Sequence, residues 1–389
     1  MIFSSNTFAN LNFYKDLSLK PLNVSDFSTK LNQDVFDSQI WPAKIDFNDK
    51  DYQVNYTLNE KLTKYIKKQL RRYRSDYASV VVIDNNTGKI LSAVDYTRKT
   101  KSFGKNLTFS SSNPAASIFK VITAAELIEN SEVNNESIFS YSGKATTLYK
   151  YQLKDKINRW TRYVPFQKAF ALSNNVVFGK AAIKNTDYVG LRNMATKFGF
   201  NKKIAQLVSP GSSKLFAEGK QYALAELASG FNRDTMISPV HGAVIASVVA
   251  NNGLFRKPTV ISEVKDLEHD RVVWSPSFSI ERVLSKKSAQ NMQGLMELTV
   301  RRGTARSAFR PWKTKRIKDL NIGGKTGTIT GGVPYGKRDW FISYAAPQGD
   351  EDKGISICVM IVNVKKWYIK STVLAKKVIE YYYTNVNNS

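Results

Sequence analysis

Cysteine and histidine are scarce in this sequence. Among 389 residues there are one cysteine, Cys358, and two histidines, His241 and His269. One cysteine excludes an internal disulfide and a thiolate-rich zinc site. Cys358 stands in the apolar run Ile-Ser-Ile-Cys-Val-Met-Ile-Val, which is typical of inert core packing. Because histidine is the usual base beside a catalytic serine, its scarcity favours a different base for any serine nucleophile here.

Long apolar runs and acidic residues are also in short supply. No run of eighteen apolar residues occurs, so the sequence shows no membrane span. The opening Met-Ile-Phe-Ser-Ser-Asn lacks the basic and apolar regions of a signal peptide. We therefore expect either a cytoplasmic protein or a chain without its export segment.

The 32 acidic residues face 58 lysines and arginines, which gives a formal net charge of +26. This charge predicts attraction to polyanions such as anionic lipid, an acidic envelope polymer or nucleic acid. No helix-turn-helix, zinc-finger or aromatic-basic RNA-binding signature accompanies it. A solvated basic surface is therefore favoured over a specific nucleic-acid site. Hydrophobic content of 42% with 23% charged residues indicates a globular chain with a real core.

One apolar stretch, residues 114–130, carries a candidate nucleophile. Its apolar residues recur at helical spacing: Ile118, Val121, Ile122, Ala125 and Ile128. Ser111–Asn113 supply capping chemistry and Pro114 suits a first turn. This predicts Ser117 in the first turn and Lys120 three residues later on the same face. If Ser117 is a nucleophile, Lys120 is its natural base.

The Ser-x-x-Lys pattern alone is weak, because Ser262 and Lys265 match it as well in a polar stretch without helical period. The alternative for Ser117 is a serine that satisfies backbone donors at a helix N-terminus, with a solvated Lys120. Two further patterns strengthen the first match. Ser173-Asn-Asn175 interrupts two helical stretches at 166–172 and 176–183, although a simple helix cap would look the same.

The second pattern is Lys325-Thr326-Gly327-Thr328, and Lys-Thr-Gly occurs nowhere else in the chain. A glycine in a strand allows a ligand or another backbone to approach closely, and the neighbouring side chains would line that approach.

The remaining patterns give the organisation of the chain. Residues 1–55 predict an irregular segment, and residues 56–389 a single larger domain. A cationic amphipathic helix is expected near 58–74, and it is more compatible with docking than with lying on a membrane. A hairpin at 78–94, many helices, a hairpin at 259–274, three strands after 320 and a closing helix at 371–382 predict an α+β fold with an antiparallel sheet.

Three motifs stand in one order along the chain: Ser117-Ile-Phe-Lys120, Ser173-Asn-Asn175 and Lys325-Thr-Gly-Thr328. This order resembles the penicillin-binding protein transpeptidase domain, a serine acyl-transferase family that shares its motifs with serine β-lactamases. The resemblance covers roughly residues 56–385, including Arg302-Gly-Thr-Ala305 and Asp339-Trp-Phe-Ile-Ser-Tyr. It implies an antiparallel five-stranded sheet with flanking helices and an all-helical subdomain. This sequence departs from the family pattern at one point, because Pro114-Ala-Ala stands before the serine where the family often has Pro-Gly.

The resemblance also implies roles in D-Ala-D-Ala chemistry on peptidoglycan stem peptides. Ser117 would be the nucleophile, Lys120 the base, and Ser173 a proton relay assisted by Lys325. The implied substrate contacts are made by Asn175, Thr326, Gly327 and Thr328. Backbone N–H groups of Ser117 and Thr328 would form the oxyanion hole. No metal or organic cofactor is needed.

Several alternatives stay open at this stage. Transpeptidase and D,D-carboxypeptidase or endopeptidase share every motif, and a silent penicillin-binding sensor or scaffold would keep the fold. Asn175 in the third position of its motif, and no visible residue dedicated to activating a deacylating water, disfavour a β-lactamase. The resemblance further implies β-lactam binding, an anionic envelope surface, possible wall-synthesis partner proteins, no nucleic acid, and an extracytoplasmic location.

Overall fold

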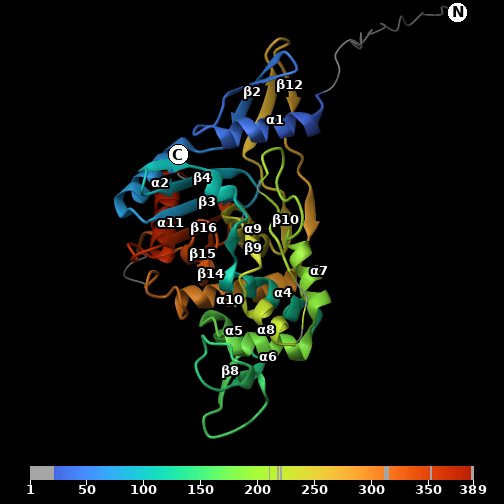
Figure 1. Ribbon diagram of the computed structural model, residues 1–389, viewed down its shortest axis with the longest axis vertical. Coiled ribbons are helices and arrows are strands. Elements are labelled where there is room, and N and C mark those ends of the chain that lie inside the picture. Colours follow the sequence, from blue (N-terminus) through green and yellow to red (C-terminus); the bar gives the residue numbers. More distant parts are fainter. Residues whose placement is uncertain are drawn as a thin grey trace, which may run out of the picture.

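A six-stranded antiparallel sheet forms the centre of the molecule (Figure 1). The computed structural model describes residues 22–209, 211–216, 219, 221–310, 315–350 and 353–386. The strands, in spatial order, are β14 (Leu320–Gly331), β15 (Gly336–Pro347), β16 (Ile355–Asn363), β3 (Tyr77–Asp84), β4 (Ile90–Thr97) and β5 (Ser102–Gly104). The prediction of five strands missed β5. This edge strand of three residues is too short to give a period-2 signal.

Each face of this sheet packs on different helices. Helix α9 (Pro239–Ala250) contacts β3, β15 and β16, whereas α2 (Glu60–Tyr73) and α11 (Ser371–Asn385) contact the sheet in a second core. Alternate residues of β3 divide accordingly: Val81 belongs to the first core and Val80 to the second. Since both faces are covered, all nine residues of β16 are buried.

The helical region occupies the lower half of Figure 1. Its helices are α4 (Lys120–Asn130), α5 (Phe166–Ala171), α6 (Asn175–Asn185), α7 (Tyr188–Lys197), α8 (Gln221–Ser229) and α10 (Lys286–Arg301). The predicted all-helical subdomain also contains a two-stranded ribbon, β7 (Ile138–Tyr141) with β8 (Arg162–Pro165). The shorter elements are α3 (Asn106–Phe109), β6 (Asn113–Pro114), β9 (Met236–Ile237), β10 (Leu254–Arg256) and β13 (Ile280–Arg282).

The prediction of an irregular segment over residues 1–55 is wrong for the part that the structure describes, and residues 1–21 lie outside it. Helix α1 (Val24–Asp37) and strands β1 (Lys44–Phe47) and β2 (Lys50–Tyr56) form here. With β11 (Ile261–Asp266) and β12 (Arg271–Trp274) they build the upper lobe, whose sheet order is β1-β2-β11-β12 (Figure 1). Strand β2 pairs locally with β1 across the two-residue turn Asn48-Asp49, in which both residues have a positive φ. Its other edge pairs with β11, which is remote in sequence. The domain boundary at residue 56 stays a prediction.

Helix α2 docks as its apolar stripe predicts. Leu62, Ile66 and Leu70 are buried, and Tyr65 stacks on Tyr381 of α11 with 3.8 Å between ring centroids. The cations of the helix and its cap face solvent: Lys61, Lys64, Lys67, Lys68, Arg71, Arg72 and Arg74. Within the described ranges, no helix combines the length and apolar character that a membrane crossing requires.

Candidate active site

The backbone around Ser117 differs from the expected helix start. Asn113 and Pro114 pair with β9, a 3-10 turn spans Ala116–Phe119, and α4 begins only at Lys120. The predicted cap at Ser111–Asn113 is therefore wrong, since the residue before α4 is Phe119 and it makes no side-chain cap. The physical reason is Ala116, whose φ of 53° is left-handed and interrupts a continuous helix.

Neighbouring elements hold this turn in place. Arg338 of β15 donates its Nε–H to Asn113 Oδ1 at 2.9 Å, and Trp340 donates its indole N–H to the Pro114 carbonyl at 3.1 Å. On the other side, Gly230 lies so close that a Cβ there would overlap the Ala116 carbonyl oxygen. The nucleophile segment is thus fixed by a buried arginine, a buried tryptophan and a glycine.

Lys120 lies within hydrogen-bond reach of Ser117. Its Nζ is 3.0 Å from Ser117 Oγ and 2.7 Å from Asn175 Oδ1, and it also donates to the Ser229 carbonyl. A neutral amine has two N–H groups and one lone pair. The two carbonyl-type oxygens can only accept, so they take both N–H groups, and the lone pair is left for the Ser117 hydroxyl proton. The geometry therefore suits a lysine base.

Burial favours the neutral form of both lysines at the site. Lys120 and Lys325 have no exposed surface. Desolvation, and then the charge of Lys325, lower the pKa of Lys120 well below its ordinary value. Desolvation alone lowers the pKa of Lys325 to about 7. Each amine therefore loses its proton far more readily than a solvated lysine does.

Ser173 joins the second lysine to the cleft. Lys325 Nζ donates to Ser173 Oγ at 2.9 Å and to the Thr326 carbonyl at 2.9 Å. Ser173 has a φ of 57° in the break between α5 and α6. The helix-cap reading of the motif is correct for Asn174, which accepts from the Val177 N–H. One break thus provides both a cap and a polar group for the site.

Asn175 connects Lys120 to the loop that contains Thr146. Its Oδ1 accepts from Lys120, and its Nδ2 donates to the Thr146 carbonyl at 2.8 Å. Both the oxygen and the nitrogen of this side chain are thus hydrogen-bonded within the protein. The contact between Asn175 and a substrate amide stays a prediction. The hydrogen bonds of Asn175 to Lys120 and Thr146 join residues 55 and 29 positions apart, and no sequence pattern predicts them.

Strand β14 lies directly against the nucleophile turn. A Cβ on Gly327 would be 3.3 Å from Ala116 Cβ and from the Ile118 nitrogen, so a glycine here permits close approach. Thr328 follows and lines the same cleft as Ser117. The oxyanion role of the Ser117 and Thr328 N–H groups stays a prediction, and this contact supports it.

The cleft has a volume of about 680 Å³. It contains Ser117, Ser173, Asn175, Thr326, Gly327 and Thr328 of the predicted site; Lys120 and Lys325 lie beneath it. Sequence reasoning missed Thr304, whose hydroxyl shares a hydrogen bond of 2.6 Å with Thr326 Oγ1. The sequence feature that could have indicated Thr304 is the preceding Gly303 in Arg302-Gly-Thr-Ala305. In the structure a Cβ at Gly303 would overlap the Ala171 carbonyl.

The remaining candidates from the sequence lie away from the cleft. His241 is buried, bonded to Ser213 and the Phe198 carbonyl, and burial lowers its pKa to about 4. Cys358 is buried in β16, where desolvation raises its pKa. Ser262 and Lys265 fall in strand β11, where Lys265 donates to Asp270 Oδ1 at 3.1 Å, and neither lines the cleft. None of these groups reaches the nucleophile.

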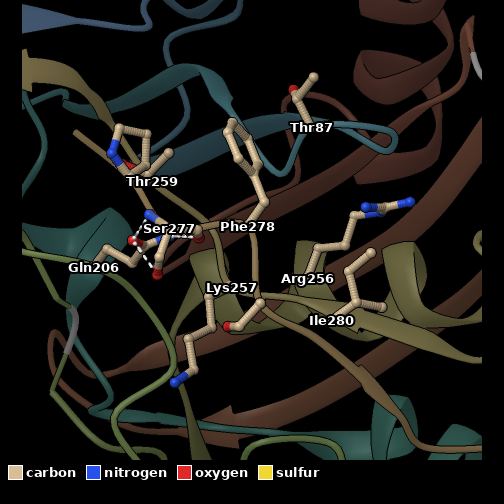
Figure 2. Close-up of a pocket in the computed structure, with 10 residues that line it drawn as sticks. Thr87, Gln206, Arg256, Lys257, Thr259, Ser277, Phe278 and Ile280 are labelled. Atoms are coloured by element: carbon tan, nitrogen blue, oxygen red, sulfur yellow. Dashed lines mark hydrogen bonds between the residues drawn. The ribbon is translucent and has the colours of Figure 1, made fainter. Parts of the chain in front are cut away.

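A second hollow lies near the β3–β4 turn (Figure 2). Gln206 joins the backbone of Ser277 there: its Oε1 accepts from the Ser277 N–H at 2.8 Å, and its Nε2 donates to the Ser277 carbonyl at 2.9 Å. Among its labelled residues, Arg256 and Lys257 are cationic, and none is a carboxylate. These contacts tie two loops together and provide no pair of nucleophile and base.

The fold and this site define a class of protein. Residues 78–380 match the family described as the penicillin binding protein transpeptidase domain, so the chain belongs to that family.

Among curated relatives, the chain is 24% identical over 265 residues to penicillin-binding protein 1A of Clostridium perfringens (strain 13), covering 66% of this chain and 36% of that protein. It is 23% identical over 269 residues to peptidoglycan D,D-transpeptidase PbpA of Mycobacterium tuberculosis (strain CDC 1551), covering 66% and 51%. The chain thus spans between a third and about half of these relatives. An imipenem acyl-enzyme complex of penicillin-binding protein A from M. tuberculosis has the same fold, with a TM-score of 0.65, 20% identity and coverage of 85% and 79%.

Proposed function

We propose that this chain is a serine D,D-transpeptidase of cell-wall synthesis, acting through a covalent acyl-enzyme on D-Ala-D-Ala stem peptides. The observation that carries the proposal is the buried Lys120 amine, 3.0 Å from Ser117 Oγ, with its other two hydrogen bonds going to pure acceptors. The named activity of the mycobacterial relative supports it. The site uses no metal or cofactor in this proposal, and the location is extracytoplasmic, in the periplasm or on the outer face of the membrane.

The chemistry follows from these positions. Ser117 Oγ attacks the carbonyl carbon between the terminal D-alanines while its proton passes to Lys120 Nζ. The oxyanion lies against the N–H groups of Ser117 and Thr328. The C–N bond then breaks, and the departing alanine amine takes the proton that Lys120 accepted, passed on through Ser173, which Lys325 orients, so that Lys120 is neutral again. An acceptor amine attacks the ester in the second half, and the proton it loses returns to Ser117 through Lys120.

Covalent labelling tests the proposal. A fluorescent penicillin should label the protein once, and Ser117→Ala should abolish labelling. Ser262→Ala is the matched control from the second Ser-x-x-Lys and should label normally. A D-Ala-D-Ala donor should lose its terminal alanine, and an added amine should appear in the product. Labelling that persists in Ser117→Ala contradicts the assignment.

The three alternatives have separate outcomes in the same experiment. Release of alanine without capture of the amine would indicate a D,D-carboxypeptidase. Stable labelling without any peptide turnover would indicate a penicillin-binding sensor or scaffold. Rapid repeated turnover of penicillin would indicate a β-lactamase instead.

A further inference from the structure

One end of the catalytic cleft carries an excess of positive charge, because three cationic side chains and one carboxylate line it. Arg233, Lys337 and Lys370 all line the cleft and are exposed to solvent. None of the three takes part in an ion pair within the part of the chain that the structure describes. They come from three separate segments, the loop after α8, strand β15 and the cap of α11.

Strand register brings this charge next to the predicted substrate contacts. Thr328 pairs with Asp339, and Thr330 pairs with Lys337, so these four side chains share one face of the β14–β15 ladder. The Nζ of Lys337 lies 5.5 Å from the ring centroid of Trp367, which is 40% exposed and also lines the cleft. The cations therefore continue the substrate cleft beyond Thr328, with an aromatic ring beside them.

Asp339, the acidic side chain among the residues that line the cleft, offsets at most one of the three positive charges. Asp339 is buried, and its Oδ2 accepts the Ser371 N–H at the start of α11 at 2.8 Å. Burial raises the pKa of Asp339 to about 6, against the opposing effects of that hydrogen bond and of Lys370 and Lys337. One terminal carboxylate from a donor, held at Thr326 and Thr328, would leave this end of the cleft cationic.

We propose that the cleft selects donors with a second carboxylate, which binds between Lys337, Trp367 and Lys370. The inference rests on the proposed function and specifies its substrate class as a donor with an anionic group beyond the terminal carboxylate. Charge-assisted hydrogen bonds from two lysines would hold that group, and Arg233 would add to the attraction across the cleft.

A matched pair of β-lactams tests this selectivity. Benzylpenicillin and carbenicillin differ by one carboxylate on the side chain, so the ratio of their second-order acylation rates isolates that charge. The wild-type protein should favour carbenicillin. In Lys337→Gln/Lys370→Gln, the ratio of carbenicillin to benzylpenicillin should fall about five- to tenfold, as expected for partly exposed charge pairs. Arg233→Gln, which alters neither β15 nor α11, should lower the ratio in the same direction.

Lys286→Gln/Lys287→Gln is the control for the general positive field, because both lysines are exposed at the start of α10 and neither lines the cleft. Its ratio should equal that of the wild type. Equal rates for the two compounds in the wild type, or an equal fall in the control, would overturn the subsite. Absence of acylation by either compound would instead overturn the proposed function, and the subsite with it.

Discussion

Lys120 and Lys325 are buried lysines with no carboxylate among their hydrogen-bond partners in the described part of the chain. Lys120 meets a hydroxyl, an amide oxygen and a backbone carbonyl, and Lys325 meets a hydroxyl and a carbonyl. Aromatic rings complete their surroundings, with Phe178 5.5 Å from Lys120 Nζ and Phe170 5.6 Å from Lys325 Nζ. Enclosing both amines opposes their protonation, so reactivity at Ser117 and stability of the fold depend on the same protons.

This dependence predicts a rise of stability with pH. The pKa of Lys325 is about 7 in the folded protein and 10.5 in the unfolded chain. Between these values the unfolded chain holds the extra proton, so the free energy of unfolding increases with pH; below about 7 both states are protonated and the full penalty applies. Urea unfolding from pH 7 to 9 should give a wild-type slope that exceeds the Lys325→Met slope by up to about 1.4 kcal/mol per pH unit. Parallel slopes would contradict a depressed pKa at Lys325.

At the scale of elements, the contact between α8 and the nucleophile turn is sensitive to one methyl group. Gly230 has a φ of +64° and lies against the Ala116 carbonyl. Gly230→Ala should displace the turn, lower the free energy of unfolding by about 2 kcal/mol or more, and slow penicillin acylation at least tenfold. Thermal unfolding and labelling rates measure both effects. Gly349→Ala is the matched control, because Gly349 also has a positive φ, +80°, and nothing lies within 4 Å of its Cβ position. Similar losses in both variants would contradict a specific contact.

Elements with a strong local signal could be predicted from the sequence. The β3–β4 hairpin and the hairpin of β11 and β12 appear where alternation predicts them. Helix α10 begins after Ser285, whose side chain accepts the Ser288 N–H. Ser117, Lys120, Ser173 and Lys325 were all named, because each lies in a short motif with fixed spacing. These motifs are local, so sequence order alone was sufficient to find them.

The missed elements depend on partners that are distant in sequence. Strand β2 is stabilised by β11, the turn at Ala116 by Gly230, and Thr304 by Thr326. In each case the stabilising contact forms only when the chain is folded. The helix predicted from Pro114 had the correct period, but the tertiary contacts of Asn113 and Pro114 with β15 override that local preference.

Across the whole molecule, the net charge is +26, and Arg233, Lys337 and Lys370 are the only cations among the described residues that line the cleft. One basic surface is formed by the exposed cations of α2, and a second basic cluster follows α10. The second consists of Arg301, Arg302, Arg306, Arg310, Lys315, Arg316 and Lys318; Lys313 belongs to the same stretch of the sequence but lies outside the described residues. We expect such charge to concentrate the protein at anionic lipid or wall polymer without altering the reaction step.

Salt should therefore separate surface binding from catalysis. Binding to anionic vesicles or sacculi should weaken strongly between 0.1 and about 0.5 M salt, while acylation by benzylpenicillin should change less than about twofold. Lys61→Glu/Lys68→Glu should weaken binding in a sedimentation assay and leave acylation intact. Lys202→Glu/Lys203→Glu makes the same charge change away from α2 and should weaken binding less. Binding that persists at high salt would require a specific recognition site.

The strand pairing in the upper lobe has a consequence for how the chain folds during its synthesis. Asn55 of β2 bonds Glu263 of β11, 208 positions later in the chain. At synthesis rates of about 5–20 residues per second, β2 waits roughly 10–40 s for that partner to leave the ribosome. Throughout this interval its backbone edge is open, and open edges recruit other strands. Strand β2 pairs with β1 locally, but its second edge stays open until β11 arrives, so we expect the nascent chain to expose that edge at residues 50–56.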